Sequence, residues 1–411
     1  MKVLVLDEWF PWPLESGKKI RTCNLMRQLA REFEILYLAY ADVAREQEKI
    51  AAMESFGIRP LPVPDQRLPK WSGRFYAAVL KNFLSPEPFS TDYHIQPNYI
   101  AALQYILAAE KPDLVHCEWS NLAPFLVHAA GVPQVIAAHN IESDIWRRLG
   151  ESGGHPAKRY LGRSQARKIE RLERHWYPRA DHCIAVSAGD RQVMEDYGAR
   201  VSLVENGVDL DYYQMAPAQT VEPVVSFTAS MDTFSNQDGA DYLVREIWPR
   251  IKKARPGVRL WLIGKDPPER LRALAKQDAG IRVTGTVPDV RDYVGQSTVC
   301  LVPLRIGGGS RLKILEAMAM GKAVVSTAIG AEGLEYTAGR DILIADAPAA
   351  FADAAIACLD DIDLRRRLGA AGRALVAARY DWRPLATKQA ALWRQVAGGE
   401  APTNMAAGEG S

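Results

Sequence analysis

Short apolar runs alternate with longer stretches of helical period along most of the chain, and this alternation limits the fold more than any other feature. Such runs are typical of parallel strands buried on both faces, with the intervening stretches forming the helices that cover them. In the first half the predicted strands are Val3–Leu6, Glu34–Tyr40, Leu114–His116, Val135–Ala138 and Cys183–Val186. In the second half they are Val224–Thr228, Arg259–Ile263, Ile281–Val283, Thr298–Val302 and Ala323–Ser326. We therefore predict an α/β protein with two parallel sheets.

The length of the chain also indicates two domains. A single hydrophobic core stops growing near about 250 to 300 residues, and this chain has 411. The stretch DLDYYQMAPAQTVEP brings two prolines and no sustained periodicity, so we place a boundary near residue 215. We predict Rossmann-like domains over 1–215 and 216–381, a helix over 382–397, and a disordered, Gly-rich tail over 398–411.

Charge and cysteine usage exclude several classes of function. The 51 basic and 49 acidic residues are interspersed, so we expect no nucleic-acid partner. The five cysteines show no C-x-x-C spacing and fit a reducing cytoplasm. The apolar run Val3–Leu6 is followed directly by two acidic residues, so it is too short for the apolar region of a secretory signal. No later run approaches the roughly 18 apolar residues of a membrane span. We therefore expect a cytoplasmic protein that touches membranes only peripherally, on the inner face of the cytoplasmic membrane.

The densest functional signal is the segment RIGGGSRLKILEAMAMGKAVVST. Three glycines follow a predicted strand, Ser310 can cap a helix that runs to Met320, and Gly321 can end that helix. Glycines let the backbone approach a ligand closely, and free N–H groups at a helix start favour an anion. Gly308, Gly309 and Ser310 therefore predict a phosphate-binding turn.

Charged residues follow this turn. Arg311 and Lys313 add positive charge, and Glu316 can accept hydrogen bonds from the hydroxyls of a sugar or ribose. Glu316 can also form a plain surface pair with Lys313, its i,i+3 neighbour. The chain has no G-x-x-x-x-G-K-[ST] sequence, and no G-x-G-x-x-G follows its first strand, so neither a P-loop phosphotransferase nor a typical dinucleotide enzyme is indicated.

Two further candidates follow predicted strands of the first half. Ligands of open α/β sheets bind outside the carboxyl ends of the strands. Gly17, in PWPLESGKKIR, can face a phosphate or sugar there, or it can simply form a tight turn. His139, in AAHNIES, can hydrogen-bond a substrate or help a proton leave, although a single histidine also serves structural roles.

Two groups of aspartates have spacings that resemble metal-binding pairs. Asp209 and Asp211 fall near the domain boundary, and the aspartates of LDDIDL fall in an amphipathic helical region typical of a solvated face. We predict no metal site from either group.

Residues 67–89 combine aromatic and basic side chains. Trp71, Phe75, Val79 and Phe83 can share one helical face, bordered by Lys70, Arg74 and Lys81. This composition suits an interfacial helix on anionic lipid. The same stripe can also pack on the N-terminal sheet.

Taken together these segments resemble family 4 of the retaining GT-B glycosyltransferases. The likeness spans nearly the whole chain and is closest to the branch linked to bacterial exopolysaccharide and exosortase-associated gene sets. It is carried by the SGKKIR loop, His139, AVS-x-x-D at Ala185, ENGVDLDYY at Glu205, FTASMDTFSNQDG at Phe227, LIGKDPP at Leu262, VTGTVPDVRDY at Val283 and the glycine-rich block from Arg305 to Thr327.

The resemblance implies two Rossmann-like domains that face each other across a cleft, with the last helix crossing back to the first domain. The C-terminal domain would hold a nucleotide diphosphate sugar as co-substrate, with no further cofactor and no metal. A glycan or lipid-linked molecule would be the acceptor.

The resemblance also implies roles for individual residues. His139 and Glu316 would be the catalytic pair, with His139 on the transferred sugar or acceptor and Glu316 on the donor ribose. The remaining donor-binding residues would be Gly17 near the diphosphate, Thr286 and Val287 near the base, and Gly308, Gly309, Ser310, Arg311 and Lys313 around the diphosphate.

One departure from the family pattern keeps other functions open. Eight positions before Glu316, where most relatives carry the first glutamate of an E-x7-E pair, this chain has Gly308. A sugar-nucleotide epimerase or a phosphorylase of the same fold is one alternative, because a fold does not fix a reaction. A catalytically silent sugar-nucleotide-binding subunit is another.

Overall fold

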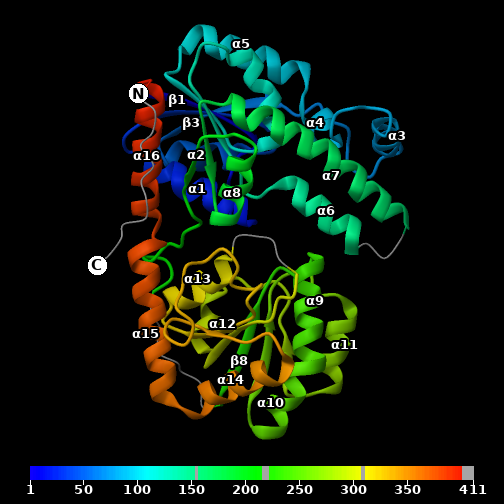
Figure 1. The fold of residues 1–411 in the computed structure, drawn as a ribbon, viewed down its shortest axis with the longest axis vertical. Helices are drawn as coiled ribbons and strands as arrows, with labels where there is room; N and C mark the ends of the chain where they lie inside the picture. Colours follow the sequence, from blue (N-terminus) through cyan, green and yellow to red (C-terminus); the bar gives the residue numbers. More distant parts are fainter. Residues whose placement is uncertain (153–155, 215–221, 307–310, 400–411) are drawn as a thin grey trace. The chain divides into compact units, whose positions relative to one another are not determined.

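The computed structural model describes residues 1–152, 156–214, 222–306 and 311–399 (Figure 1). The chain divides into two compact units. Unit 1 comprises Met1–Glu205 together with the chain from Arg383 onward, and unit 2 comprises Asn206–Trp382. Each unit is built on a parallel β-sheet, as the alternation of strand and helix patterns predicted.

The sheet of unit 1 has seven strands in the order β3-β2-β1-β4-β5-β6-β7. The order reverses between β1 and β4, so the loops after these two strands flank a topological switch point, where open α/β sheets bind ligands. The strands are β1 (Lys2–Trp9), β2 (Glu34–Ala41), β3 (Ile58–Pro64), β4 (Leu114–Cys117), β5 (Gln134–Ala137), β6 (His182–Ala185) and β7 (Val201–Leu203).

Helices pack around this sheet in unit 1. The first begins at Gly17, and the Ser16 hydroxyl caps it by accepting a hydrogen bond from the Lys19 N–H at 3.3 Å. The helices are α1 (Gly17–Leu29), α2 (Gln47–Ser55), α3 (Gly73–Asn82), α4 (Phe89–His94), α5 (Pro97–Glu110), η1 (Ser120–Ala129), α6 (Glu142–Ser152), α7 (Pro156–Trp176), η2 (Tyr177–Arg179) and α8 (Ala188–Asp196).

The sheet of unit 2 has six strands in the order β10-β9-β8-β11-β12-β13, which reverses between β8 and β11. The strands are β8 (Val224–Thr228), β9 (Arg259–Ile263), β10 (Ile281–Val283), β11 (Val299–Val302), β12 (Ala323–Ser326) and β13 (Leu343–Ile344). The helices are α9 (Phe234–Tyr242), η3 (Leu243–Ile247), α10 (Trp248–Ala254), α11 (Glu269–Gln277), α12 (Arg291–Gln296), α13 (Leu312–Ala319), α14 (Pro348–Asp360) and α15 (Ile362–Arg379).

The division between the units falls at Glu205 and not near residue 215. The segment after Glu205 belongs to unit 2 because the Val208 N–H donates to the Tyr380 carbonyl at 2.7 Å and the Tyr213 hydroxyl donates to Glu316 at 2.9 Å. These contacts join residues far apart in sequence, which a change of composition does not reveal.

The last helix, α16 (Trp382–Ala397), returns the chain to unit 1. The indole of Trp393 is fully buried there and meets the Phe33 ring edge to face, with 5.4 Å between ring centroids. In the part of the chain that the structure describes, no helix is long and apolar enough to cross a membrane.

The aromatic stripe predicted for residues 67–89 is divided between two faces. The Phe75 ring packs edge-on against Phe89 at 5.3 Å, and the Phe83 ring stacks on Tyr160 at 5.8 Å, so both are half-buried. They pack against α4 and α7, and not on the sheet. Trp71 of the predicted stripe is exposed instead, together with Tyr76, Leu80 and Leu84 on and beside α3.

Candidate functional site

Helix α13 carries the charged residues predicted to bind a donor. Gly308, Gly309 and Ser310 lie outside the described residues. The N-cap is Arg311, in a left-handed conformation with φ of 52°, and not Ser310 as predicted. The helix ends at Ala319, and Gly321 follows with φ of 68°, which confirms its role as the stop.

Lys313 and Glu316 lie one turn apart on α13 and have separate partners. The Lys313 ammonium donates to Asn236 Oδ1 at 2.7 Å and lies 5.1 Å from the centre of the Phe227 ring. Burial, aided by the Arg311 charge, lowers the pKa of Lys313 to about 7. Glu316 accepts from the Tyr213 hydroxyl at 2.9 Å, and burial raises the pKa of this carboxyl. The plain surface pair between the two residues is therefore not what the structure contains.

Arg311 forms two hydrogen bonds with Glu332. Its Nε donates to the Glu332 carbonyl at 3.0 Å and its Nη2 to Glu332 Oε2 at 2.9 Å. The Arg311 side chain is only 7% exposed. An anion that recruited this guanidinium would have to compete with Glu332.

Thr286 and Val287 follow β10, the edge strand of the sheet in unit 2. Val287 packs against a small apolar cluster formed by Val224, Trp261 and Ile263, while Thr286 is exposed. No hydrogen bond or ion pair recorded for the described residues joins either of them to α13.

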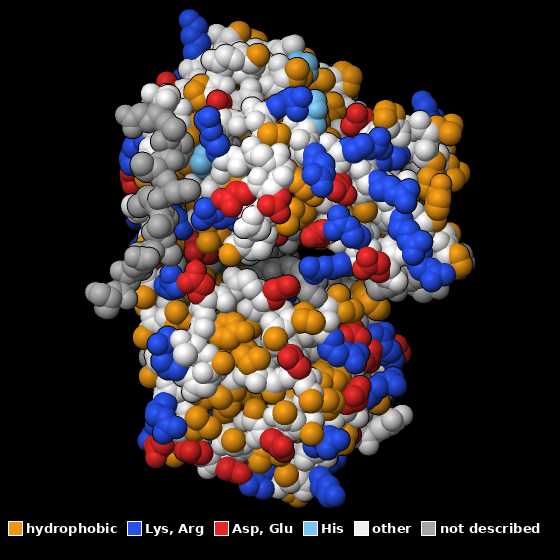
Figure 2. Space-filling view, viewed as in Figure 1, with side chains coloured by type: hydrophobic (Ala, Val, Ile, Leu, Met, Phe, Trp, Pro, Cys, Tyr) orange, Lys and Arg blue, Asp and Glu red, His pale blue; other side chains and the backbone are white. Residues whose placement is uncertain are grey.

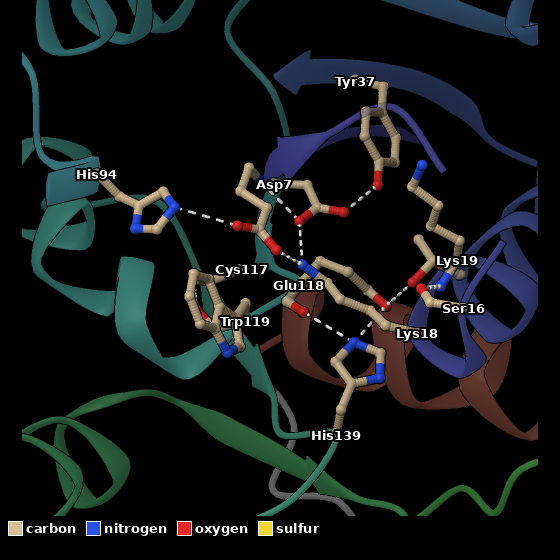
Figure 3. A network of polar contacts seen from close by, with 12 residues as sticks. Asp7, Ser16, Lys18, Lys19, Tyr37, His94, Cys117, Glu118, Trp119 and His139 are labelled. Atoms are coloured by element: carbon tan, nitrogen blue, oxygen red, sulfur yellow. Dashed lines mark hydrogen bonds and ion pairs between the residues drawn. The ribbon is translucent and has the colours of Figure 1, made fainter. Parts of the chain in front are cut away.

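Unit 1 gathers charged side chains at the switch point of its sheet (Figure 3). Lys18, in the first turn of α1, donates to Asp7 Oδ1 at 2.5 Å and lies 3.3 Å from Glu8 Oε1. Its ammonium also lies 5.1 Å from the centre of the Trp119 ring. Burial opposes the charge of Lys18, but the two carboxylates outweigh it and raise the pKa of Lys18.

The carboxylates of β1 have further partners. Asp7 Oδ2 accepts from the Tyr37 hydroxyl at 2.6 Å, and Glu8 Oε2 lies 3.1 Å from His94 Nε2. Against the effect of burial, Lys18 and His94 lower the pKa of Glu8. Burial raises the pKa of Asp7 although Lys18 opposes it.

His139 joins this cluster through Glu118, which directly follows β4. Nε2 of His139 lies 2.9 Å from the Glu118 carbonyl oxygen and 3.2 Å from Glu118 Oε1. Burial works against the Glu118 anion, but hydrogen bonds from His116 and His139 hold its pKa well below the ordinary value. Gly17 begins α1 next to Lys18, and so lies beside the same cluster.

Several residues of these clusters were not singled out from the sequence. Asp7 and Glu8 were read only as the end of an apolar run, although their place near the carboxyl end of a strand is the signal that pointed to His139. Glu118 carries the same signal after β4. The partners of α13 in unit 2, Asn236 and Tyr213, lie in two of the segments that carry the family resemblance, but nothing in those segments pointed to a contact with α13.

The paired aspartates have structural roles. Asp209 Oδ1 accepts from the backbone N–H groups of Asp211 and Tyr212, both at 2.9 Å, which forms a local turn. Asp361 caps α15 by accepting from the N–H groups of Asp363 and Leu364. Within the described ranges no group of three or more His, Cys, Asp or Glu side chains is placed to hold a metal ion.

Two family models match the sequence. Residues 17–212 match the model described as Glycosyltransferase Family 4, and residues 222–361 match the one described as Glycosyl transferases group 1. The phosphatidyl-myo-inositol mannosyltransferase of Mycobacterium tuberculosis is 31% identical over 237 residues, covering 54% of this chain and 62% of that protein. The chain thus spans less than two thirds of this relative's length.

Solved structures resemble the chain over nearly its whole length. Sucrose-phosphate synthase from Thermosynechococcus elongatus has a TM-score of 0.72 at 18% identity, with 97% of this chain and 100% of that chain covered. Anabaena HepE, solved with UDP and glucose, has a TM-score of 0.66 at 16% identity, with 96% and 99% covered. The chain therefore has the GT-B fold, in which residues 17–212 match the Glycosyltransferase Family 4 model and residues 222–361 match the Glycosyl transferases group 1 model.

Proposed function

We propose that this protein transfers a sugar from a nucleotide diphosphate sugar to a glycan or lipid-linked acceptor, in the synthesis of a bacterial exopolysaccharide. The two family domains support the reaction class, and the M. tuberculosis relative is named for transfer of mannose to a lipid. The resemblance to retaining enzymes supports retention at the anomeric carbon. These domain matches favour a transferase over an epimerase or phosphorylase.

The observation that carries the proposal is the pair Lys313 and Glu316 on α13. Lys313 is a buried amine whose pKa has fallen to about 7, so a diphosphate beside it would stabilise the charged form. Glu316, already bonded to the Tyr213 hydroxyl, has the acceptor oxygens that a ribose or sugar hydroxyl needs. One turn of helix thus offers groups for both halves of a nucleotide sugar.

The proposed reaction needs charge stabilisation at the leaving group. Negative charge grows on the β-phosphate as the sugar bond breaks, and Lys313 with the N-terminal amides of α13 would stabilise it in place of a metal ion. The acceptor hydroxyl would attack from the face that the nucleotide leaves and would give its proton to the departing phosphate. His139 of unit 1 would contact the transferred sugar or the acceptor, with Gly17 near the diphosphate.

Thermal-shift screening of UDP, GDP, ADP and dTDP sugars would identify the donor, because a ligand of the native state raises the melting temperature. Nucleoside diphosphate release should then require an acceptor.

Lys313→Ala and Glu316→Ala should each weaken donor use by roughly 1.5 to 3 kcal/mol, the usual contribution of a charge-assisted hydrogen bond. Lys276→Ala, which removes an exposed ion pair with Glu269 on α11, serves as the control.

Each alternative predicts a different result in this assay. Release of nucleotide without acceptor would indicate hydrolysis, whereas a changed sugar that stays attached to its nucleotide would favour an epimerase. Donor binding without turnover against any lipid or glycan acceptor would favour a silent binding subunit. Unchanged kinetics in both α13 variants would remove this helix from the site.

We also propose peripheral contact with an anionic membrane through residues 67–89. Trp71 is 75% exposed and Leu84 is 91% exposed, and Lys70, Arg74 and Lys81 are exposed around them. Figure 2 shows further Lys and Arg side chains over α6 and α7. Exposed apolar groups beside basic groups suit a surface of anionic lipid, to which each Lys or Arg adds about 1 kcal/mol.

Cosedimentation with phosphatidylglycerol vesicles at low salt tests this contact. Wild type should bind, and Trp71→Ala combined with Leu84→Ala should release it. Tyr105→Ala is the control, because Tyr105 is equally exposed at 74% but lies on α5. Equal binding by all three proteins, or none by wild type, would exclude this segment as the contact.

A further inference from the structure

Every polar group recorded around the Glu118 carboxylate is a hydrogen-bond donor. The Thr22 hydroxyl donates to Oε1 at 2.7 Å, and His116 Nε2 lies 2.6 Å from Oε2. His139 Nε2 lies 3.2 Å from Oε1. The Glu118 side chain is only 3% exposed, so these donors replace water as its partners. A buried carboxylate held in this way has a fixed orientation.

The last helix fixes the proton of His116. The indole Nε1–H of Trp393 points at His116 Nδ1 at 3.2 Å, and an indole nitrogen can only donate. Nδ1 of His116 must therefore accept, which leaves the ring proton on Nε2. That proton is donated to Glu118, so His116 is a neutral donor whose role is set by α16.

The same reasoning fixes His139. Its Nε2 lies 2.9 Å from the Glu118 carbonyl oxygen, which can only accept. Nε2 of His139 must carry a proton, shared between this carbonyl and the nearby carboxylate. The remaining ring atom, Nδ1, has no partner recorded among the described residues, and in Figure 3 it lies on the side of the ring away from Glu118.

We propose that Glu118 is a positioning residue that holds His139 through Nε2 and thereby presents Nδ1 to a hydroxyl group of the sugar or the acceptor. When the ring is neutral, with its proton on Nε2, it accepts a hydrogen bond from that hydroxyl at Nδ1. This assignment rests on the proposed glycosyl transfer and adds to it the atom that meets substrate. Glu118 itself touches no substrate, because its oxygens are occupied by Thr22, His116 and His139.

Glu118→Gln tests the assignment with little change of shape. Because Trp393 keeps the His116 proton on Nε2, the amide oxygen must take the place of Oε2. The amide nitrogen then takes the place of Oε1 and faces the Nε2–H of His139, so the side-chain hold on His139 is lost and only the backbone carbonyl contact remains. We expect kcat to fall about 10- to 100-fold, the range seen when the group that orients a metal-binding histidine is removed, with donor KM changed by less than about threefold. Tyr37→Phe is the control, because it removes a hydrogen bond to Asp7 in the same cluster and none to Glu118.

A double-mutant cycle with His139→Gln separates positioning from folding. If Glu118 acts through His139, Glu118→Gln should cost almost nothing more once His139 is replaced. Fully additive losses would overturn the proposal, and so would wild-type kcat in Glu118→Gln. A loss in Tyr37→Phe as large as that in Glu118→Gln would also overturn it, since general disturbance of the cluster would then suffice.

Nitrogen-15 NMR of the full chain, labelled at histidine, tests the proposal without an activity assay, because it reports the tautomer of each histidine ring. The expected spectrum shows His139 as the Nε2–H tautomer in wild type, assigned by its absence in His139→Gln, and a changed tautomer ratio in Glu118→Gln. A wild-type Nδ1–H tautomer would refute the assignment. If no donor and acceptor pair supports transfer while the tautomer is as expected, the proposed function fails and the geometry of His139 stands.

Discussion

Replacing Glu173 with Gln is expected to stabilise unit 1 at pH 8 and to have little effect at pH 5. Glu173 lies on α7 with no exposed surface and binds the start of α6, where the Ser143 hydroxyl donates to Oε2 at 2.5 Å and the Ser143 N–H to Oε1 at 3.3 Å. Burial raises the pKa of Glu173 to about 7, with a smaller contribution from the neighbouring Glu142. In the folded protein the neutral form of the Glu173 carboxyl is therefore more stable, relative to the ionised form, than it is in the unfolded chain.

The size and sign of the effect follow from linkage. A folded-state pKa above the ordinary 4.5 means that the contribution of Glu173 to stability is complete below about pH 4.5 and is lost as the pH rises through 7. At 1.36 kcal/mol for each pH unit, the complete loss is roughly 3 kcal/mol. Gln cannot ionise, so the advantage of Glu173→Gln should grow from below about 1 kcal/mol at pH 5 to roughly 3 kcal/mol at pH 8.

Urea denaturation at pH 5, 6.5 and 8, followed by far-UV circular dichroism, measures this difference. If the two units unfold separately, only one transition should respond. Glu170→Gln is the matched control, because Glu170 lies on the same helix in a partly exposed ion pair with Arg174, which is worth at most about 1 kcal/mol. A constant difference between wild type and Glu173→Gln at all three pH values, or one that shrinks toward pH 8, would refute the reasoning.

Two further results are expected for the donor site. The pKa of Lys313 is about 7 and a diphosphate favours its charged form, so calorimetry should show that the affinity for a nucleotide sugar falls, with growing proton uptake, as the pH rises from 7 to 9. Lys313→Arg should remove this pH dependence, because arginine stays charged. A wild-type affinity that does not change over this pH range would contradict the prediction. Transfer activity should survive EDTA, since Lys313 and helix amides can stabilise the leaving group, whereas a complete loss that magnesium or manganese restores would refute metal independence.

Most of the sheet framework could be predicted from the sequence because buried parallel strands are short, apolar and separated by helices. The strands that escaped prediction break that pattern for physical reasons. Ile58–Pro64 contains three prolines, which remove backbone donors, and it is tolerated because it is the edge strand β3. Val201–Leu203 and Leu343–Ile344 are too short to show a period.

The candidate site was predictable only in part. His139 and Lys313 follow strands and could be identified by position, but Asn236 and Tyr213 meet α13 across 77 and 103 residues of sequence. The exposed face of α3 was misassigned because apolar residues occupy both sides of this helix. The packing of Phe75 on α4 and of Phe83 on α7 shows which side faces the unit.

The charges at the switch point of unit 1 are best explained by function and not by stability. Asp7 and Glu118 are buried and Glu8 and Lys18 are largely buried, which removes most of the water around these charges. Apolar residues of similar volume often serve stability equally well. Proteins depart from the usual pattern of apolar cores and exposed charges mainly at functional sites. These charges gather at the carboxyl ends of β1 and β4, where the strand order of this sheet reverses. The protonation of His116 is set there by Trp393, which lies 277 residues later in the sequence. Changes in how α16 packs on unit 1 should therefore alter the hydrogen bonding of His139 through two side chains, His116 and Glu118. These contacts connect the last helix to the proposed site.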